Sequence, residues 1–327
     1  MNDSKILDIL KYNQGFDNPK DWIEYAKRHG FGKVRAHKRL KCPECNRTNS
    51  RTIGQYIYYS QLMRIKKCRN CKFIFSDFVL DKDIIMNHFE IAYKNQRYFD
   101  VLRKPVFNHI VDTVLRRFPN KRSVIDVGGA RGHLAFMLKR RNSKYEITVS
   151  DISKKACEYA ISHFGINSIC CSVEELYKQN LSFDIILLID VIYYSEDIKG
   201  AWDSISRCIN DDGVLIMRLP NKIWWVELFQ IIKGMFRKNR RADKITGINP
   251  EHIYFLNRSY LRNKMANLGF RDMEFCPSPL TYSRNPFKIL FSKLIYIISL
   301  IIYYLTLKRV CISPAQLLLA WRPKRMH

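Results

Sequence analysis

Residues 123–134, SVIDVGGARGHL, constrain the fold of this chain more than any other segment. The apolar first half is typical of a buried strand, the glycines that follow indicate a turn, and the residues after the turn begin a helix. A second apolar run, residues 146–150, ends at Asp151 and places an acid at the tip of the next strand. The loop, the helix and the spaced acid together predict a βαβ unit that binds an adenosine-type ligand.

The spacing of the small residues in this loop separates two classes of ligand. The dinucleotide fingerprint G-x-G-x-x-G packs amide groups against a pyrophosphate, but here the small residues fall at Gly128, Ala130 and Gly132. Asp126 is poorly placed for an anionic pyrophosphate and suits a ligand with a sulfonium and an ammonium group. The loop resembles motif I, D-x-G-x-G-x-G, of the class I S-adenosylmethionine (SAM) methyltransferases. Ala130 replaces the middle glycine, and we expect this mild change to retain binding.

Later segments resemble the same family in the order that it requires. They match the loop that brackets adenine, the fourth strand, the fifth strand, a downstream signature and the last strand, at residues 171–176, 183–192, 210–217, 250–270 and 316–321. The resemblance implies an α/β fold: a Rossmann-like seven-stranded methyltransferase sheet with helices on both faces. Apart from the resemblance, alternating strands and helices and the continuous apolar run at 183–192 predict a mostly parallel sheet.

The resemblance also implies which residues bind SAM. Asp151 would bind the ribose, and the loop with Val173 and Glu174 would bracket the adenine. The full predicted set is Asp126, Gly128, Gly129, Ala130, Gly132, Asp151, Ile152, Val173, Glu174 and Asp190.

The residues expected near the acceptor depart from the family in one place. The subgroup usually carries Glu-His after the fourth strand, where this chain has Tyr193 and Tyr194. His252 is our candidate general base, because it titrates near neutral pH and lies between the fifth strand and the last long helix. The alternative is that His252 anchors a cap over the pocket. Tyr194 is our second catalytic candidate, with a role in orienting the substrate.

Two C-x-x-C knuckles, Cys42/Cys45 and Cys68/Cys71, predict a metal site before the methyltransferase domain. Two knuckles together supply four thiolates, which is the ligand set of a structural zinc ion with no open position for catalysis. The β-favouring residues between them predict the hairpin of a zinc ribbon. A ribbon of this kind resembles those of bacterial methyltransferases that act on sugars and natural-product intermediates, and also those of some ribosomal RNA methyltransferases.

We divide the chain into three parts with two insertions. These are an N-terminal region at 1–80 with the ribbon at about 40–76, a helical linker or lid at 81–121, a methyltransferase domain at 122–327, and insertions at about 222–247 and 285–310. Tyr93 and Tyr98 are candidate lid residues, with a role as ordinary core aromatics as the alternative. The first insertion, with Trp224 and Trp225, predicts an amphipathic cap over the substrate pocket.

The second insertion contains an apolar segment, residues 287–307, whose uncharged part, 294–307, is flanked by Lys288, Lys293, Lys308 and Arg309. We expect it to be apolar on every face and to bind an anionic membrane interface. It cannot cross the membrane once if residues 316–321 return to the sheet. A helix buried in the core or against a partner subunit is the alternative.

The net charge of +26 favours polyanionic partners: a phosphorylated substrate, an anionic membrane or nucleic acid. A compositional bias of the genome is the alternative source of this charge. Because no RNA-recognition signature accompanies it, we place nucleic acid behind the other two. Residues 1–10 contain two acids and no continuous apolar run, so no signal peptide is visible, and the ten cysteines indicate a reducing cytoplasm.

These features predict a SAM-dependent methyltransferase with a small-molecule acceptor, either a saccharide or a lipid-linked biosynthetic intermediate that carries phosphate. It would be cytoplasmic and peripheral at the inner face of the membrane. The first alternative is an RNA methyltransferase that uses the ribbon and the basic surface to bind nucleic acid. The second is an inactive SAM-fold protein anchored at a membrane, with Tyr193 and Tyr194 marking lost chemistry.

Overall fold

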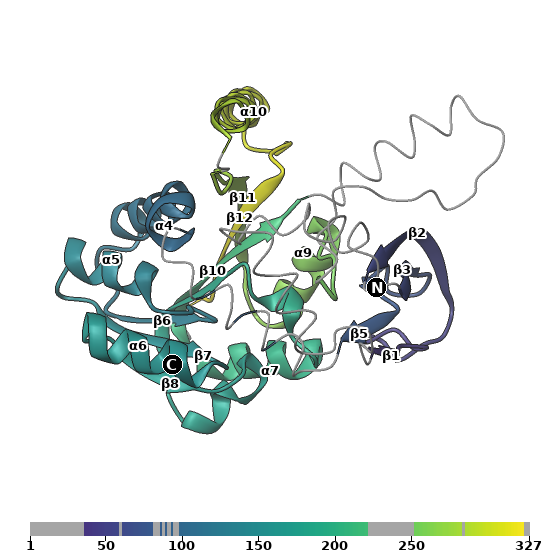
Figure 1. Ribbon diagram of the computed structural model, residues 1–327, viewed down its shortest axis with the longest axis horizontal. Coiled ribbons are helices and arrows are strands. Elements are labelled where there is room, and N and C mark those ends of the chain that lie inside the picture. Colours follow the sequence, from purple (N-terminus) through teal and green to yellow (C-terminus); the bar gives the residue numbers. More distant parts are fainter. Residues whose placement is uncertain are drawn as a thin grey trace, which may run out of the picture.

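The computed structural model of this protein places two neighbouring units, a large α/β domain and a small β module (Figure 1). The residues that it describes are 36–58, 61–80, 98–221, 252–282 and 285–323, with the single residues Met86, Phe89 and Tyr93. The predicted cap at 222–247 and the side chain of Tyr98 lie outside the described residues.

The large domain is built on a seven-stranded sheet in the order β11-β12-β10-β9-β6-β7-β8. Five neighbouring strands, β10 to β8 in that order, run parallel, and β12 pairs antiparallel with both β10 and β11. This arrangement confirms the predicted Rossmann-like methyltransferase sheet. The strands are β6 (Ser123–Val127), β7 (Glu146–Asp151), β8 (Asn167–Cys170), β9 (Phe183–Ile189), β10 (Ile209–Pro220), β11 (Asp272–Pro277) and β12 (Ala315–Trp321).

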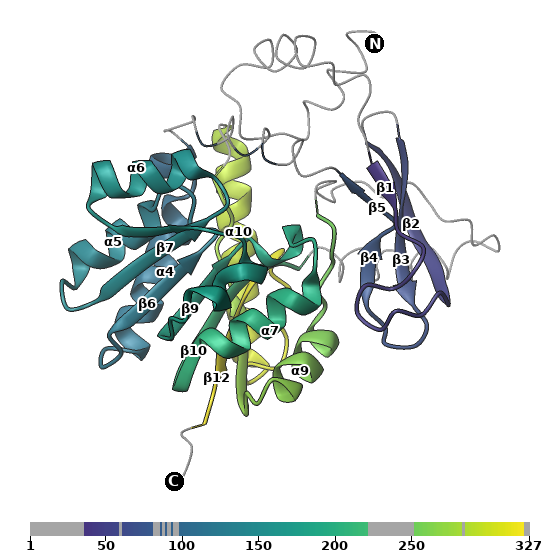
Figure 2. The same cartoon turned by 90° about the horizontal axis from the view of Figure 1, so that it is seen from below.

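Helices cover both faces of this sheet, because its central strands are apolar on both sides. Along β9, Ile185 and Leu187 belong to one hydrophobic cluster while Ile186 and Leu188 belong to another, as the two-residue period of a strand requires. The first cluster includes α4 (Lys104–Arg117) and α5 (His133–Arg141). The second includes α7 (Ile198–Cys208) and α9 (Arg258–Asn267), while α6 (Lys154–Phe164) lies beside β7 and β8 (Figure 2).

Short helical segments lie at the carboxyl edge of the sheet. They are the π-helix η2 (Tyr98–Leu102) before α4, and the 3-10 helices η3 (Val173–Gln179) and η4 (Ile192–Tyr194) after β8 and β9. The loops at this edge of a parallel sheet are where such folds bind their ligands.

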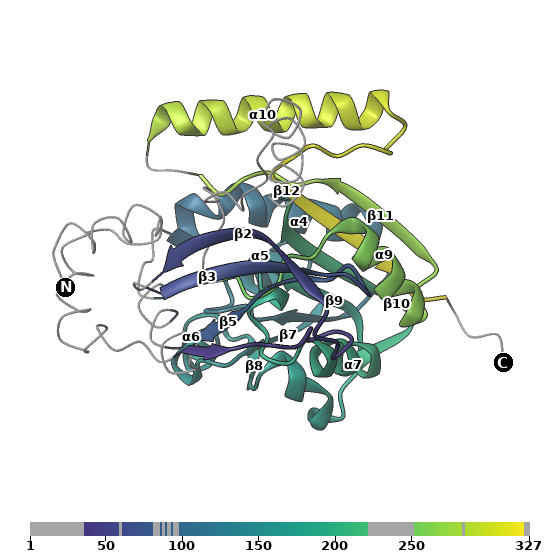
Figure 3. The ribbon, with the colours of Figure 1, turned by 90° about the vertical axis from the view of Figure 1, so that its right-hand side faces the viewer.

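The longest helix of the described chain, α10 (Pro286–Leu305), leaves and rejoins the sheet at this same carboxyl edge. The register places Ala315 at the start of β12 beside Pro220 at the end of β10, and Pro277 at the end of β11 beside Gln316. The helix therefore forms an excursion between two neighbouring strands, and Figure 3 shows it lying across the outside of the domain.

The small module consists of a three-stranded sheet and a two-stranded ribbon. Strands β2 (Ser50–Tyr58) and β3 (Gln61–Cys68) form the predicted hairpin, and β4 (Ile74–Ser76) pairs with β3. Strand β1 (Ala36–Lys38) pairs with β5 (Phe78–Leu80) and brings the two ends of the module together.

The module docks on the residues that precede α9. The Ser76 amide donates a hydrogen bond to the Ile253 carbonyl at 2.8 Å, and the Phe255 amide donates to the Ile74 carbonyl at 3.0 Å. The ring of Phe73 lies 4.6 Å from that of Tyr260, and both side chains belong to the hydrophobic cluster on one face of the large sheet. The module and the domain therefore share one core.

Candidate active site

The loop between β6 and α5 has the conformation that its glycines predict. The amides of Gly128 and Gly129 donate hydrogen bonds to the Ser150 carbonyl at 2.7 and 3.1 Å, which joins this loop to the end of β7. Gly128 has a φ of +66°, and a Cβ there would lie 2.3 Å from the Val191 side chain. Gly132 adopts a φ of +79° at the start of α5. Larger residues at Gly128 or Gly132 would strain or displace the loop.

Ala130 lies in the left-handed region, with a φ of +50°. This conformation explains why the family pattern has glycine at the position, since a side chain there costs about 1–2 kcal/mol. The alanine methyl group is buried in the cluster that includes Phe99 and Leu134, and this packing partly offsets that cost. The Ala130 amide donates to Asp151 Oδ2 at 2.9 Å, so the substituted loop is still tied to the strand-tip acid.

Asp151 is buried at the end of β7 and organises the loops around it. Besides the bond from Ala130, its Oδ1 accepts a hydrogen bond from the Ser153 amide at 2.9 Å, and its Oδ2 accepts one from the Tyr93 hydroxyl at 3.2 Å. Tyr93, a candidate lid residue, thus contacts the predicted cofactor site. The neighbouring Ile152 is 40% exposed and offers an apolar surface beside the acid.

Asp126 is the second buried acid of this site. Burial and the nearby negative charge of Asp151 raise the pKa of Asp126 to about 7, and burial also raises the pKa of Asp151. Two buried carboxyl groups that disfavour each other's ionised form are stabilised by a positive ligand. The sulfonium and ammonium groups of SAM therefore fit the chemistry of these residues.

The predicted adenine loop is tied to the loop after β9. Val173 is buried at the start of η3, and Glu174 Oε1 accepts a hydrogen bond from the Ser195 hydroxyl at 2.6 Å. The same oxygen accepts bonds from the amides of Glu196 and Asp197 at 2.9 and 3.3 Å. Glu174 thus holds η3 close to the segment that carries Tyr193 and Tyr194.

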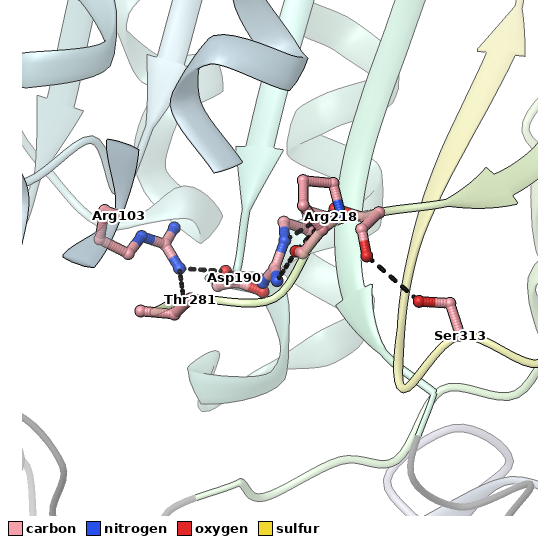
Figure 4. A network of polar contacts seen from close by, with 7 residues as sticks. Arg103, Asp190, Arg218, Thr281 and Ser313 are labelled. Atoms are coloured by element: carbon pink, nitrogen blue, oxygen red, sulfur yellow. Dashed lines mark hydrogen bonds and ion pairs between the residues drawn. The ribbon is translucent and has the colours of Figure 1, made fainter. Parts of the chain in front are cut away.

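Asp190 lies between two buried arginines that our sequence analysis did not identify (Figure 4). Its Oδ2 pairs with Arg103 Nη1 at 2.6 Å and with Arg218 Nη1. Burial alone would raise the pKa of Asp190, but the charges of Arg218 and Arg103 outweigh it and lower that pKa. Arg218 also donates to the Ser278 hydroxyl at 3.0 Å and to the Pro279 carbonyl at 2.9 Å.

Asp190 is therefore positioned by its ion pairs as well as by its strand. The signal that could have revealed Arg218 is its place inside the otherwise apolar run of β10, because a buried cation requires a partner. The sequence around Arg103 does not indicate that this residue is buried, because it lies just before α4 between both polar and apolar residues.

His252 lies in an aromatic pocket at the same edge of the sheet. Its ring centroid is 3.9 Å from that of Tyr193 and 5.5 Å from that of Tyr194. The Ile253 amide donates to the Tyr193 carbonyl at 3.0 Å and fixes the segment against η4. Phe89 contacts Tyr194 edge-on, with ring centroids 5.0 Å apart. The structure thus brings together the two catalytic candidates, His252 and Tyr194.

The four cysteines of the small module lie close enough to share one metal ion. The Sγ atoms of Cys42 and Cys71 are 3.6 Å apart, those of Cys45 and Cys68 are 3.5 Å apart, and all four lie within 4.8 Å of one another. Tetrahedral zinc with Zn–S bonds of about 2.3 Å needs sulfurs about 3.8 Å apart. The donor set and its spacing fit structural zinc.

Comparisons with known proteins identify the family of the domain that contains these residues. A profile described as a methyltransferase domain matches residues 98–274, more than half of the 327-residue chain. The malonyl-[acyl-carrier protein] O-methyltransferase of Geobacter sulfurreducens is 21% identical over 200 residues, which are 60% of this chain and 73% of that protein.

Similar solved structures are more distant in sequence. The plantazolicin methyltransferase BpumL in complex with SAH has a TM-score of 0.46 and 14% identity, over 74% of this chain and 91% of its own. A possible histamine N-methyltransferase from Thermotoga maritima has a TM-score of 0.47 and 14% identity, over 72% and 97% of the two chains. These likenesses indicate no acceptor. The profile match and the architecture of the sheet show that the chain belongs to the methyltransferase domain family and is a class I SAM-dependent methyltransferase.

Proposed function

We propose that this enzyme methylates a saccharide or a lipid-linked biosynthetic intermediate. The observation that supports a methyl acceptor beside the cofactor is a chain of contacts: the Tyr93 hydroxyl donates to Asp151, the Tyr93 ring stacks on Phe89, and Phe89 contacts Tyr194, which lies against His252. SAM, when bound, supplies a methyl group that is open to in-line attack. The chain contributes a fixed geometry, which brings a nucleophile and the methyl group to attack distance.

His252 is the proposed general base for an oxygen or carbon nucleophile. Its burial beside Tyr193 and Tyr194 keeps water away from a proton in transit, and the backbone of the next residue, Ile253, is hydrogen-bonded to both η4 and β4. Tyr194 is only half-buried and its ring lies 5.5 Å from that of His252, so its proposed role is to orient the acceptor beside the base. The pair Tyr193 and Tyr194 then replaces the Glu-His of the subgroup, and the base comes from a later segment of the chain.

Replacing His252 with alanine is expected to lower turnover about a hundredfold or more while SAM affinity stays the same, because proton transfer is lost and the cofactor loop is untouched. Turnover and SAM binding by calorimetry are the two measurements. His163→Ala, which changes an exposed histidine of α6, is the matched control. Equal losses of turnover, SAM binding and thermal stability would show that His252 only anchors the fold.

SAM affinity is expected to rise as the pH rises through about 7. Below the raised pKa of Asp126, about 7, its carboxyl group is mainly protonated in the free enzyme. A cationic ligand favours the carboxylate, so binding releases a proton, and Kd should increase up to about tenfold per pH unit below that pKa. Calorimetry in buffers of different ionisation enthalpy checks the proton release. Asp126→Asn should bind more weakly and with no such slope, and a pH-independent Kd in the native enzyme would contradict the assignment.

We also propose that the small module holds one structural zinc ion at Cys42, Cys45, Cys68 and Cys71. The support is the spacing of the four sulfurs. The role is structural because all four ligand positions are thiolates and the module packs on the segment that begins at Ile253, next to His252.

Methyl transfer from radiolabelled SAM tests the acceptor class directly. The purified enzyme is incubated separately with nucleotide sugars, with polyprenyl-phosphate-linked saccharides and with total RNA. Incorporation into either saccharide pool supports the proposal. Incorporation into RNA alone, with a binding constant that falls steeply with salt, would replace it with the RNA methyltransferase alternative.

A further inference from the structure

Helix α10 turns polar side chains toward the protein and apolar side chains away from it, the opposite of a helix on the surface of a water-soluble domain. The side chains that it buries against the domain are Ser299 and Tyr303, and the Tyr303 hydroxyl donates to Glu274 Oε1 at 2.8 Å. Tyr296, on the same side, meets the ring of His109 edge-on at 6.3 Å. The expectation that this segment is apolar on every face is therefore wrong in one respect: a narrow polar stripe contacts the protein.

The opposite side of α10 is apolar and exposed. Only 11% of its most hydrophobic window is buried, although the helix is long and apolar enough to cross a membrane. The outward side chains are 43–81% exposed, and they are Phe287, Leu290, Phe291, Leu294, Ile297, Ile298, Ile301, Tyr304 and Leu305. A continuous apolar surface of this kind is unfavourable in water and marks a surface that is covered by another phase or molecule.

The charges around α10 favour an anionic lipid surface as the partner of its exposed apolar side. Residues 285–309 contain no aspartate or glutamate, whereas Lys288 and Lys293 lie on the helix and Lys308 and Arg309 follow it. All four cationic residues are exposed, and of these Lys308 also pairs with Glu274 at 3.5 Å. The whole chain has a net charge of +26. A second copy of the chain would bring these cations against identical ones. An anionic lipid surface attracts them, at about 1 kcal/mol for each residue near the headgroups.

Both ends of α10 are fixed to the carboxyl edge of the sheet. Before the helix, the Tyr282 amide donates to the Leu102 carbonyl at 2.8 Å. After it, the side-chain amide of Asn221 donates to the Cys311 and Ser313 carbonyls at 3.1 and 3.0 Å. The helix is about 30 Å long at 1.5 Å per residue, yet the segments before and after it are both attached to the carboxyl edge of the sheet. It is thus arranged to lie along a bilayer rather than to cross it.

The segment that enters α10 also contacts the ion-pair cluster of the active site. Ser278 and Pro279 accept hydrogen bonds from Arg218, and the Ser313 hydroxyl, on the returning segment, donates to the Ser278 carbonyl at 3.1 Å (Figure 4). The Thr281 hydroxyl lies 3.5 Å from Arg103 Nη1. The segments on either side of α10 therefore contact the ion-pair cluster of Asp190, Arg103 and Arg218 directly.

We infer that α10 is an in-plane anchor that binds an anionic bilayer through its outward apolar side, and that it holds the acceptor site near the lipid headgroups. The inference rests on the proposed function in one respect: it selects the lipid-linked acceptor over a freely soluble saccharide. The polar stripe joins the helix to the protein, the apolar side enters the acyl region, and the basic residues bind the headgroups.

Flotation of the full-length enzyme with lipid vesicles tests the anchor. The enzyme should float with vesicles that contain phosphatidylglycerol, float less with phosphatidylcholine alone, and be partly released by high salt. Ile297→Ser/Ile301→Ser should reduce the bound fraction at least about tenfold. The matched control, Ile161→Ser/Leu181→Ser, changes two apolar side chains of similar exposure elsewhere on the surface and should float like the native enzyme.

Lys288→Gln/Lys293→Gln should weaken the preference for phosphatidylglycerol, because two of the four cationic residues are removed. An enzyme that stays monodisperse and unbound with both kinds of vesicle would overturn the inference. So would a dimer in solution that Ile297→Ser/Ile301→Ser dissociates, because the apolar side would then be a subunit interface. SAM affinity should be the same in all these variants, so failure of the anchor is distinguishable from failure of the cofactor site.

Discussion

Cys68→Ser is expected to remove the metal and unfold the small module, and to lower activity even though no cysteine of the module lies in the active site. A structural zinc site contributes about 10–16 kcal/mol of apparent binding free energy in small zinc modules, most of which is folding free energy. Without it, the contacts from β4 to Ile253 and Phe255 are lost. We expect a zinc content near zero, lower solubility, and turnover lowered about a hundredfold or more through displacement of His252.

Elemental analysis, the soluble fraction after centrifugation and turnover measure these three effects, and thermal unfolding reports the loss of stability. Cys170→Ser is the matched control, because Cys170 is exposed and lies in β8, away from the cluster. The control should keep its zinc and its solubility. A Cys68→Ser enzyme that is metal-free, stable and fully active would rule out a structural role for the metal.

Asp151→Ala is expected to reduce SAM affinity by more than any other single change in the cofactor loop. Asp151 is proposed to make two charge-assisted hydrogen bonds to the ribose, worth about 1.5–3 kcal/mol each, so their loss would correspond to at least a hundredfold increase in Kd. The substitution also removes the acceptor for the Ala130 amide, which loosens the loop itself. Calorimetric titration with SAM measures the effect.

Asp151→Asn separates the two contributions. Asparagine keeps one carbonyl acceptor for the Ala130 amide while it removes the charge, so the loop should keep more of its stability than in Asp151→Ala. Both variants should fall well below the native affinity. Unchanged affinity in Asp151→Ala would falsify the ribose assignment.

The fold was predictable because its strands and loops carry local signals. The run of β9 is apolar on both faces, the glycines at Gly128 and Gly132 mark backbone of positive φ, and Asp151 ends a strand where the pattern requires an acid. Each of these signals depends on residues within a few positions of one another, and periodicity reports such local features well.

The parts that sequence reasoning missed depend on contacts between distant segments. Arg103, which lies before α4, and Arg218, which lies in β10, both form ion pairs with Asp190. The local sequence around each arginine does not indicate this shared partner. Docking of the small module also depends on contacts between distant segments. Glu44, which lies between the two cysteines of the first knuckle, accepts a hydrogen bond from the Tyr260 hydroxyl at 2.7 Å and pairs with Lys264. Hydrogen bonds and ion pairs between residues this far apart in the sequence can be identified only in the folded structure.

The shared core of the small module and the methyltransferase domain links the abundance of this enzyme to the supply of metal. Phe73 and Phe75 belong to the same cluster as α9 and the sheet, so binding of the proposed metal would stabilise the module and the domain together. With the proposed zinc, each tenfold increase in free ion above its Kd adds about 1.4 kcal/mol to the stability of the folded state. A cell short of zinc would then hold fewer folded molecules, and methylation would decline through protein turnover before any change in catalysis.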